Sequence, residues 1–314
     1  MDIHASPRPR RTARTAVAAL IAAAGCWGVG TVVSKQVVDD VPPLTLLPVQ
    51  LAASCAFLLV VALVRREPLT WTQSVRRLAA LGVLNPGIAY ALGLLGLTTI
   101  AASMSVLLWA LEPVAILLLA ALVLRECIPP ALAITVAVAM SGALLVVYQP
   151  GATGDAVGVT LTVVSIGFCA LYTVLTRRLM LDDSSLTVVL AQQAVALGFA
   201  VALASVVELA GGPGWDFAGL DTGAWLTAAV SGLLYYGLGF FFYVAGLRHL
   251  PASYAGAFLP LIPVFGVAAG YLVGERLDPR QWLGALVIVT ATAVIAVRPR
   301  SGGERAPHTS YGSV

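Results

Sequence analysis

The chain has 314 residues, of which 59% are hydrophobic and 11% are charged, and its mean hydropathy is +0.93. Soluble globular domains carry about 25% charged residues, so this composition excludes an ordinary soluble domain. The net charge is +3 at pH 7, and almost all of the positive charge comes from arginine because Lys35 is the only lysine. Little chain remains outside the apolar segments for an ATP-binding module or a soluble receptor domain.

Ten apolar segments of about 20 residues follow one another, and each is long enough to cross a bilayer core of about 30 Å as a helix. They lie at residues 15–35, 43–64, 76–97, 101–123, 129–148, 157–177, 185–209, 223–247, 251–273 and 279–297. The predicted fold class is an all-α membrane protein with ten transmembrane helices. Its expected surroundings are a lipid bilayer, and no nucleic acid is expected as a partner.

The basic residues separate into two sets when these spans are threaded through a membrane from an inside N-terminus. The inside set is Arg8, Arg10, Arg11, Arg14, Arg65, Arg66, Arg76, Arg77, Arg125, Arg177, Arg178, Arg248, Arg298, Arg300 and Arg305. The outside set is Lys35, Arg276 and Arg280. Because basic residues collect on the cytoplasmic side, we expect a multi-pass protein of the cytoplasmic (inner) membrane with both termini in the cytoplasm.

The two halves of the chain repeat each other in order. An offset of 142 residues pairs Gly25 with Gly167, Thr31 with Thr173, Lys35 with Arg177, Thr45 with Thr187 and Gln50 with Gln192. Offsets of 150 and 149 pair Gly82 with Gly232, Gly96 with Gly246, Ser103 with Ser253, Pro113 with Pro263, Glu126 with Glu275 and Pro130 with Pro279. Five spans per copy would invert the second copy relative to the first, as in many secondary transporters. We expect two inverted five-helix repeats at 15–150 and 151–298, between cytoplasmic tails at 1–14 and 299–314.

The span at 101–123 carries Glu112 and Pro113 near its middle. An acidic side chain at that depth is costly, so by default it faces a partner, a water-filled cavity or a ligand. In a continuous helix, Ser105 and Trp109 would share the face of Glu112. Glu112 is therefore a candidate to bind a proton or a substrate ammonium group, with Trp109 as an aromatic wall. The alternative is a structural role, in which Glu112 hydrogen-bonds a neighbouring helix beside the bend at Pro113.

Several motifs resemble one known family. The runs Leu111-Glu112-Pro113 with Arg125-Glu126, and Ile262-Pro263 with Gly274-Glu275-Arg276-Leu277, each preceded by Ala-Ser, resemble the two EamA domains of the drug/metabolite transporter superfamily. Cys26-Trp27-Gly28 followed by Lys35 resembles the first helix of that family. The resemblance covers about residues 15–298. It implies a pseudo-twofold carrier whose central cavity is lined mainly by helices 1, 3, 4, 6, 8 and 9.

The same resemblance implies a range of substrates, since members of the family export amino acids and other metabolites or move nucleotide-sugar-type and drug-like solutes. The sequence departs from the family at Gln50, about where the second helix often carries an arginine. An anionic substrate is therefore less expected here.

Other residues in the spans are further candidates for a substrate site: Gln50, Asn85, Tyr90, Gln192, Tyr236, Phe240, Tyr243 and Tyr254. The two glutamines could orient a substrate, but hydrogen bonds between helices are the favoured interpretation. The aromatic stripe 236, 240 and 243 could line a cavity or simply pack. Pro113 and Pro263 could act as hinges during alternating access or form static kinks.

Signatures of other functions are missing from the sequence. It has no G-x-x-x-x-G-K-[ST] loop and no H-E-x-x-H motif, and its 3 histidines and 4 cysteines show no metal-ligand or disulfide spacing. No cofactor, metal site or enzymatic activity is expected. A membrane-embedded lipid-modifying enzyme is the alternative from another functional class.

We therefore expect a secondary-active transporter, an efflux carrier that exports small metabolites such as amino acids by alternating access. Protons moving through Glu112 are the expected energy source, and uniport is the alternative. Uptake and multidrug efflux are the alternatives within transporters. The protein is expected to work as a monomer or a homodimer.

Overall fold

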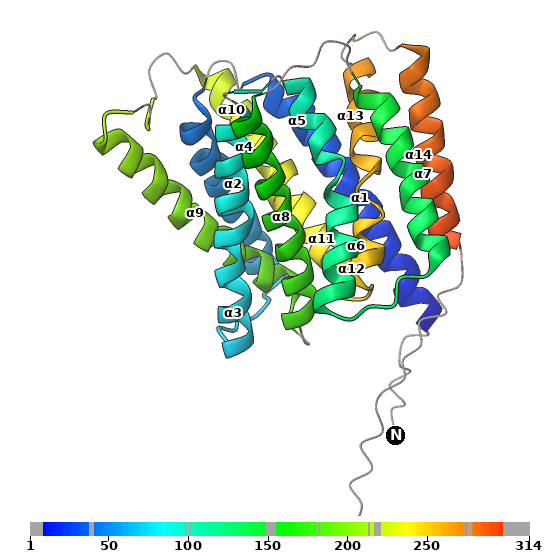
Figure 1. Cartoon of the computed structure of the whole chain (residues 1–314). Helices are drawn as coiled ribbons and strands as arrows, with labels where there is room; N and C mark the ends of the chain where they lie inside the picture. Colours follow the sequence, from blue (N-terminus) through cyan, green and yellow to red (C-terminus); the bar gives the residue numbers. More distant parts are fainter. Residues whose placement is uncertain are drawn as a thin grey trace, which may run out of the picture.

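A computed structural model describes residues 9–37, 41–97, 99–100, 102–148, 155–180, 183–212, 214–216, 221–272, 274 and 278–297. The predicted tail 299–314, most of the tail 1–14, and the residues Glu275 and Arg276 lie outside this part of the chain. The described elements are helices, gathered side by side in one bundle (Figure 1). The predicted all-α class is confirmed.

Eight helical segments in the described residues are long and apolar enough to cross a membrane. Six are single helices: α1 (Pro9–Lys35), α2 (Pro43–Val64), α7 (Pro130–Val147), α8 (Ala156–Leu179), α9 (Ser185–Leu209) and α14 (Pro279–Val297). The other two, Thr222–Leu247 and Ala252–Leu272, are each built from shorter elements, and α6 (Glu112–Val123) is a shorter apolar helix. These segments make the fold that of a multi-pass membrane protein.

Four of the predicted spans consist of consecutive shorter elements. The span 76–97 comprises α3 (Gln73–Gly82), the π-helical turn η1 (Val83–Ile88) and α4 (Ala89–Leu97), and 223–247 comprises α10 (Thr222–Gly232), the π-helical turn η2 (Leu233–Gly239) and α11 (Phe240–Leu247). The span 101–123 comprises α5 (Ala102–Trp109) and α6, and 251–273 comprises α12 (Ala252–Gly256) and α13 (Leu261–Leu272). They are the third and fourth spans of each predicted repeat.

Prolines explain three of these breaks. Asn85 has φ −149° and ψ 123°, outside the helical region, and it precedes Pro86 through a cis peptide bond. A residue before proline is disfavoured in helical conformation, so the chain leaves the helix there. Pro113 is the second residue of α6, and Pro263 is the third residue of α13, which follows a turn ending at Pro260. Both predicted hinge prolines therefore lie in the first turn of a half-helix, where a missing N–H costs little.

Helices from the two halves pack against each other across the whole bundle. α7 packs on α14 at one edge, and α2 packs on α9 at the other (Figure 1). Between these edges α1 packs on α11 and α13, while α8 packs on α4 and α6. Each half thus supplies one long helix, α1 or α8, that lies against the composite spans of the other half.

Two glycines at matching positions allow the closest of these approaches. A Cβ on Gly82 would stand 2.8 Å from the carbonyl carbon of Gln192, and one on Gly232 would stand 2.8 Å from the carbonyl carbon of Gln50. Contacts of that length do not occur between real side-chain and backbone atoms, so both positions need glycine. Small residues let transmembrane backbones approach closely in this way.

The side chains of the same two glutamines hydrogen-bond between helices. The Gln50 amide nitrogen donates to Ser34 Oγ at 3.1 Å and to Ser231 Oγ at 2.8 Å. The Gln192 amide nitrogen donates to Thr176 Oγ1 at 3.3 Å, and its oxygen accepts from the Tyr172 hydroxyl at 2.8 Å. Both glutamines are buried. Such bonds satisfy amides that would otherwise be costly inside a membrane.

Candidate functional site

Glu112 begins α6 at the break in the fourth predicted span. α5 ends at Trp109, so Ala110 and Leu111 form the turn between the two half-helices. The Leu111 N–H donates to the carbonyl oxygen of Leu108 at 2.8 Å, which closes α5 before the chain changes direction. A carboxylate in the first turn of a helix is stabilised by the positive end of the helix dipole. The break therefore holds the acid where its charge is best tolerated.

The carboxyl group of Glu112 lies beside interior side chains from the second half of the chain. The side chain is half-buried, and it lies near Cys169 of α8, Tyr235 of η2 and Tyr243 of α11. Within the described ranges, no donor or cation lies within hydrogen-bond or ion-pair distance of this carboxyl group. The interhelical hydrogen bond considered for Glu112 is thus not made by any described residue.

Eight aromatic side chains from both halves form a continuous cluster next to Glu112, which we call the aromatic cluster. Its members are Trp27 of α1, Tyr90 of α4, Trp109 of α5, Tyr172 of α8, Tyr235 and Tyr236 of η2, and Phe240 and Tyr243 of α11. Centroids of neighbouring rings are 5.1 to 6.5 Å apart, mostly tilted or edge to face. This is the spacing of favourable aromatic contacts.

The aromatic cluster unites five of the residues singled out from the sequence: Tyr90, Trp109, Tyr236, Phe240 and Tyr243. It does not include Tyr254, which is half-buried in α12 and packs against the main apolar core. Ser105 is buried within α5, and Asn85 is buried at the kink in η1. Because α5 ends three residues before Glu112, Ser105 does not continue the helical face of Glu112 as a continuous span would have placed it.

Sequence reasoning did not assign Trp27 and Tyr172 to the site. Trp27 has its ring centroid 5.2 Å from that of Tyr243 and 5.6 Å from that of Phe240. The Tyr172 ring lies 5.9 Å from Phe240, and its hydroxyl is bonded to Gln192. The available signal was the family-like first-helix motif that contains Trp27. For Tyr172 the sequence offers none, because a lone tyrosine in an apolar span has no distinguishing pattern.

Several polar atoms near the aromatic cluster are already bonded, and a few are not. The Tyr90 hydroxyl donates to the Tyr235 hydroxyl at 2.9 Å, and the Tyr243 hydroxyl lies 3.4 Å from Thr173 Oγ1. In contrast, the indole N–H of Trp27 is buried and finds no acceptor among the described residues. Buried donors are normally satisfied, so this N–H is an exception within the described residues.

The profile of the EamA-like transporter family matches the chain twice, over residues 14–148 and over residues 156–297. The chain belongs to the EamA-like transporter family. It thereby belongs to the drug/metabolite transporter superfamily, as predicted, and carries two EamA repeats. Members of this family are transporters, in keeping with the unpaired acid between the two repeats.

Among solved structures, 27 chains match this EamA protein. One of them, described only as "Crystal structure of protein", is 18% identical and superposes with a TM-score of 0.76 over 92% of this chain and 99% of its own. At that identity the likeness shows the fold alone. No curated protein matches the chain.

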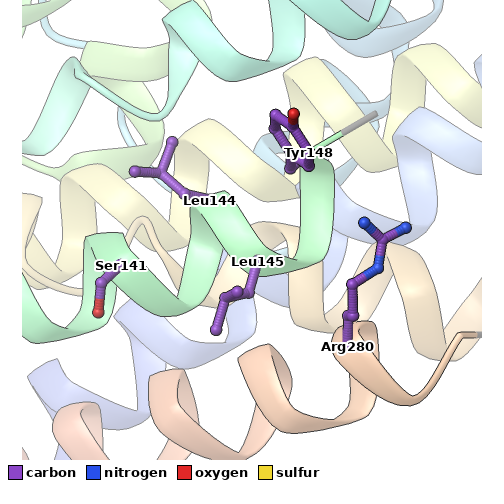
Figure 2. Close-up of a pocket in the computed structure, with 5 residues that line it drawn as sticks. All are labelled: Ser141, Leu144, Leu145, Tyr148 and Arg280. Atoms are coloured by element: carbon purple, nitrogen blue, oxygen red, sulfur yellow. The ribbon is translucent and has the colours of Figure 1, made fainter. Parts of the chain in front are cut away.

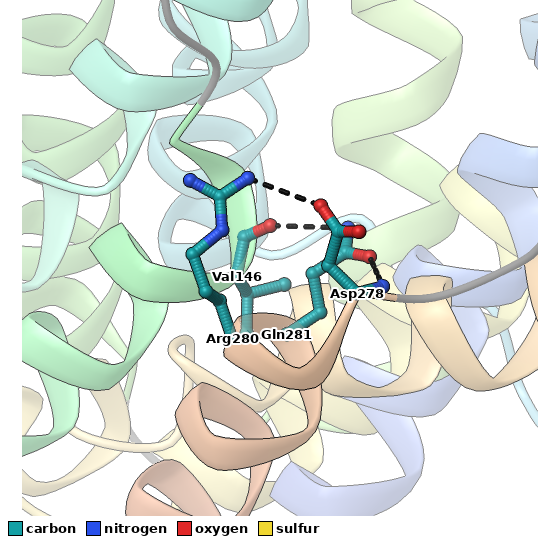
Figure 3. Close-up of polar contacts among 4 residues, drawn as sticks. All are labelled: Val146, Asp278, Arg280 and Gln281. Carbon is teal, nitrogen blue, oxygen red and sulfur yellow. Dashed lines mark hydrogen bonds and ion pairs between the residues drawn. The ribbon is translucent and has the colours of Figure 1, made fainter.

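A pocket of about 400 Å³ on the EamA bundle lies away from the aromatic cluster. It is lined by Ser141, Leu144, Leu145 and Tyr148 of α7 and by Arg280 of α14 (Figure 2). Beside it, Arg280 pairs with Asp278 at 3.1 Å and the Gln281 amide donates to the Val146 carbonyl oxygen at 3.4 Å (Figure 3). Leu144, Leu145 and Tyr148 are exposed, so the hollow faces the surroundings of the bundle.

Glu126 joins the two EamA repeats through hydrogen bonds. Its carboxylate oxygens accept from the backbone N–H groups of Ala252 at 2.9 Å and Ser253 at 3.1 Å, and from Ser253 Oγ at 2.6 Å. A carboxylate from the first repeat thus caps the N-terminus of α12 in the second, satisfying N–H groups that a helix start leaves open. Arg125 is adjacent to Glu126 in the sequence and is a possible ion-pair partner. Within the described chain Glu126 makes this cap instead.

Proposed function

We propose that the protein is a secondary-active carrier of the cytoplasmic membrane that exports small metabolites, with amino acids as the reference substrates, by alternating access. Glu112 is the proton-coupling residue. The observation that carries this proposal is an unpaired carboxyl group at a helix break, placed beside residues from the other repeat. An ionisable group inside a membrane protein marks a substrate, ion or proton site by default.

The proposed topology is ten spans in two inverted five-helix repeats, with both termini in the cytoplasm. Two matched contacts support this topology. Gly82 of the first repeat contacts Gln192 of the second, and the equivalent residues Gly232 of the second repeat and Gln50 of the first make the same contact. A Cβ on Gly96 would likewise lie 3.0 Å from the Gly158 carbonyl oxygen, and one on Gly246 would lie 3.1 Å from the Ala16 carbonyl oxygen. Exchanged contacts of this kind are expected from a twofold relation between two copies of one unit.

The side-chain hydrogen bonds of the two glutamines also match between the repeats. Gln50 bonds to Ser34 in the first repeat, and Gln192 bonds to Thr176 in the second. Both serine or threonine partners lie 16 residues before their glutamine. Broken helices at matching positions also belong to carriers of this architecture, in which binding residues lie at the breaks near the bilayer midplane. We propose that Pro113 and Pro263 lie at the two hinges.

Reconstitution of the purified protein in liposomes tests the carrier proposal. A labelled metabolite inside the vesicles is expected to leave unmodified when a pH gradient is applied, and more slowly without one. Mass spectrometry of the external medium checks that the molecule is unchanged. Appearance of a chemically altered product, or of no labelled molecule above the rate of empty liposomes across a metabolite panel, would count against a carrier.

The Glu126 cap is expected to hold the cytoplasmic ends of the two repeats together. In Glu126→Ala the three hydrogen bonds are lost, and loss of a helix cap costs about 1 kcal/mol. Cys169, which is buried near Glu112, should then react faster with a thiol reagent added from the cytoplasmic side, in a background where Cys26, Cys55 and Cys127 are replaced by alanine. Arg76→Ala, an exposed change at the cytoplasmic end of α3 in the proposed topology, is the control. An unchanged Cys169 rate would show that the cap does not gate access.

A further inference from the structure

The described ionisable groups at the proposed site include an acid but no base. Glu112 supplies an unpaired carboxyl group. The arginines whose side chains the structure describes lie toward the ends of helices or in the connections: Arg14, Arg65, Arg66, Arg76, Arg77, Arg125, Arg177, Arg178, Arg248 and Arg280. None of these described cations lies within ion-pair distance of Glu112 or belongs to the middle of a span. Among the described residues, the site therefore offers one acidic group and no cation.

The aromatic cluster reinforces this preference. Indole and phenol rings attract cations through their electron-rich faces, by about 0.5–2 kcal/mol for each well-placed ring. Trp109 lies three residues before Glu112, and Tyr235 and Tyr243 lie near Glu112. Trp109 is half-buried, as are Tyr90 and Tyr235, so these rings keep accessible surface. An acid beside accessible aromatic rings suits a cation with an apolar body.

A substrate carboxylate would find no cation near Glu112 or the aromatic cluster among the described residues. The amide groups of Gln50 and Gln192 are committed to interhelical bonds, and the Tyr90 hydroxyl already donates to Tyr235. Burying an ionised carboxylate without a cation or several donors is strongly unfavourable. Among the described residues, the indole N–H of Trp27 is the fully buried donor of the aromatic cluster that has no acceptor. A neutral donor of this kind suits a carbonyl, ether or hydroxyl oxygen better than a full negative charge.

We propose that the transported substrates are organic monocations: amines with an apolar or aromatic body, without a carboxylate, and with a neutral oxygen that accepts from Trp27. The ammonium group lies at Glu112 and the body lies against the aromatic cluster. This inference rests on the proposed carrier function, and it specifies amines and amino-acid amides or esters as substrates in place of free amino acids.

The test compares four small molecules that share one phenyl ring: phenylalanine, phenylalanine amide, phenethylamine and 3-phenylpropionate. Each is added to liposomes containing the full-length protein preloaded with labelled phenethylamine, and release of the label by exchange is measured. Phenylalanine amide should exchange best and phenethylamine next, phenylalanine about tenfold less effectively, and phenylpropionate at the background rate. Thermal stabilisation of the detergent-purified protein by the unlabelled compounds should follow the same order.

Two variants assign the contacts. Trp27→Phe replaces the indole with a smaller ring that has no N–H, so it should abolish the advantage of the amide over phenethylamine in both exchange and stabilisation. Glu112→Gln should remove the stabilisation by both cations. Exchange and stabilisation by phenylalanine that equal or exceed those by its amide would overturn the inference and leave the carrier proposal standing. Failure of all four compounds would also overturn it, and the metabolite flux assay above then judges the carrier proposal separately.

Discussion

Glu112→Gln is expected to reduce pH-gradient-driven export to the rate of empty liposomes while leaving expression and gel-filtration behaviour unchanged. Glutamine has nearly the same shape as glutamate and can still hydrogen-bond, but it cannot take up or release a proton. Because no described residue pairs with the Glu112 carboxyl group, the substitution breaks no described polar contact. The change therefore removes the titrating group with little cost to the fold.

Asp155→Asn is the matched control for this experiment. Asp155 is exposed at the start of α8, and its side chain makes no capping hydrogen bond. The same loss of one negative charge there should leave gradient-driven export unchanged. Full pH-dependent export by Glu112→Gln would eliminate Glu112 as the coupling site.

His249 is a second group to separate from Glu112, because histidine ordinarily titrates near pH 6.5. Partial burial, and the positive charges of Arg248 and Arg177, lower the pKa of His249 from that value. His249 is therefore mainly neutral at pH 7, because its pKa lies below 6.5. His249→Gln should leave the pH dependence of transport between pH 6.5 and 8 unchanged, which a pH series of initial rates measures.

Gly82→Ala is expected to destabilise the protein more than any other single-methyl change on the α3–α9 interface. The new Cβ would overlap the carbonyl group of Gln192. Because the nearest atoms of Gln192 belong to its backbone, no side chain can move aside to relieve the overlap. Inserting a methyl group into a packed interior typically costs about 1–3 kcal/mol. The expected result is a large fall in the temperature of thermal aggregation in detergent and a low yield of folded protein.

Gly198→Ala provides the control in the same pair of helices. Gly198 lies within α9, and a Cβ placed there meets no atom within 4 Å. Alanine is favoured over glycine in a helix by about 1 kcal/mol, so this variant should be as stable as the parent or more stable. The equivalent change in the other repeat, Gly232→Ala, should behave like Gly82→Ala because it would overlap the carbonyl group of Gln50. Equal stability of Gly82→Ala and Gly198→Ala would contradict the described packing of α3 on α9.

The sequence was informative where one strong physical preference determines the structure of a segment or the placement of a residue. The hydrophobic length of the spans predicted the helical membrane fold, and the depth of Glu112 in its span marked it as exceptional before its surroundings were known. The break before Pro113 also follows from proline chemistry, since proline cannot donate to the helix it enters.

The sequence was less informative where several weak preferences compete. Spans 76–97 and 223–247 were predicted as continuous helices, yet each contains a π-helical turn. Pro86 could have signalled the first, but Leu233–Gly239 contains no proline, and its geometry depends on packing against α1 and α2. The Glu126 cap was also beyond prediction, because it joins residues 126 positions apart through a helix start that hydropathy does not mark.

Reactivity of Cys169 from each side of the membrane tests most directly whether one central site is shared by two repeats. Cys169 is buried in α8 next to Glu112, and replacement of Cys26, Cys55 and Cys127 by alanine leaves it as the sole thiol. In oriented vesicles, a membrane-impermeant thiol reagent should modify Cys169 when added to either face, and a transported substrate should slow both reactions. Modification from one face only, or only by a reagent dissolved in the lipid, would contradict alternating access to this site.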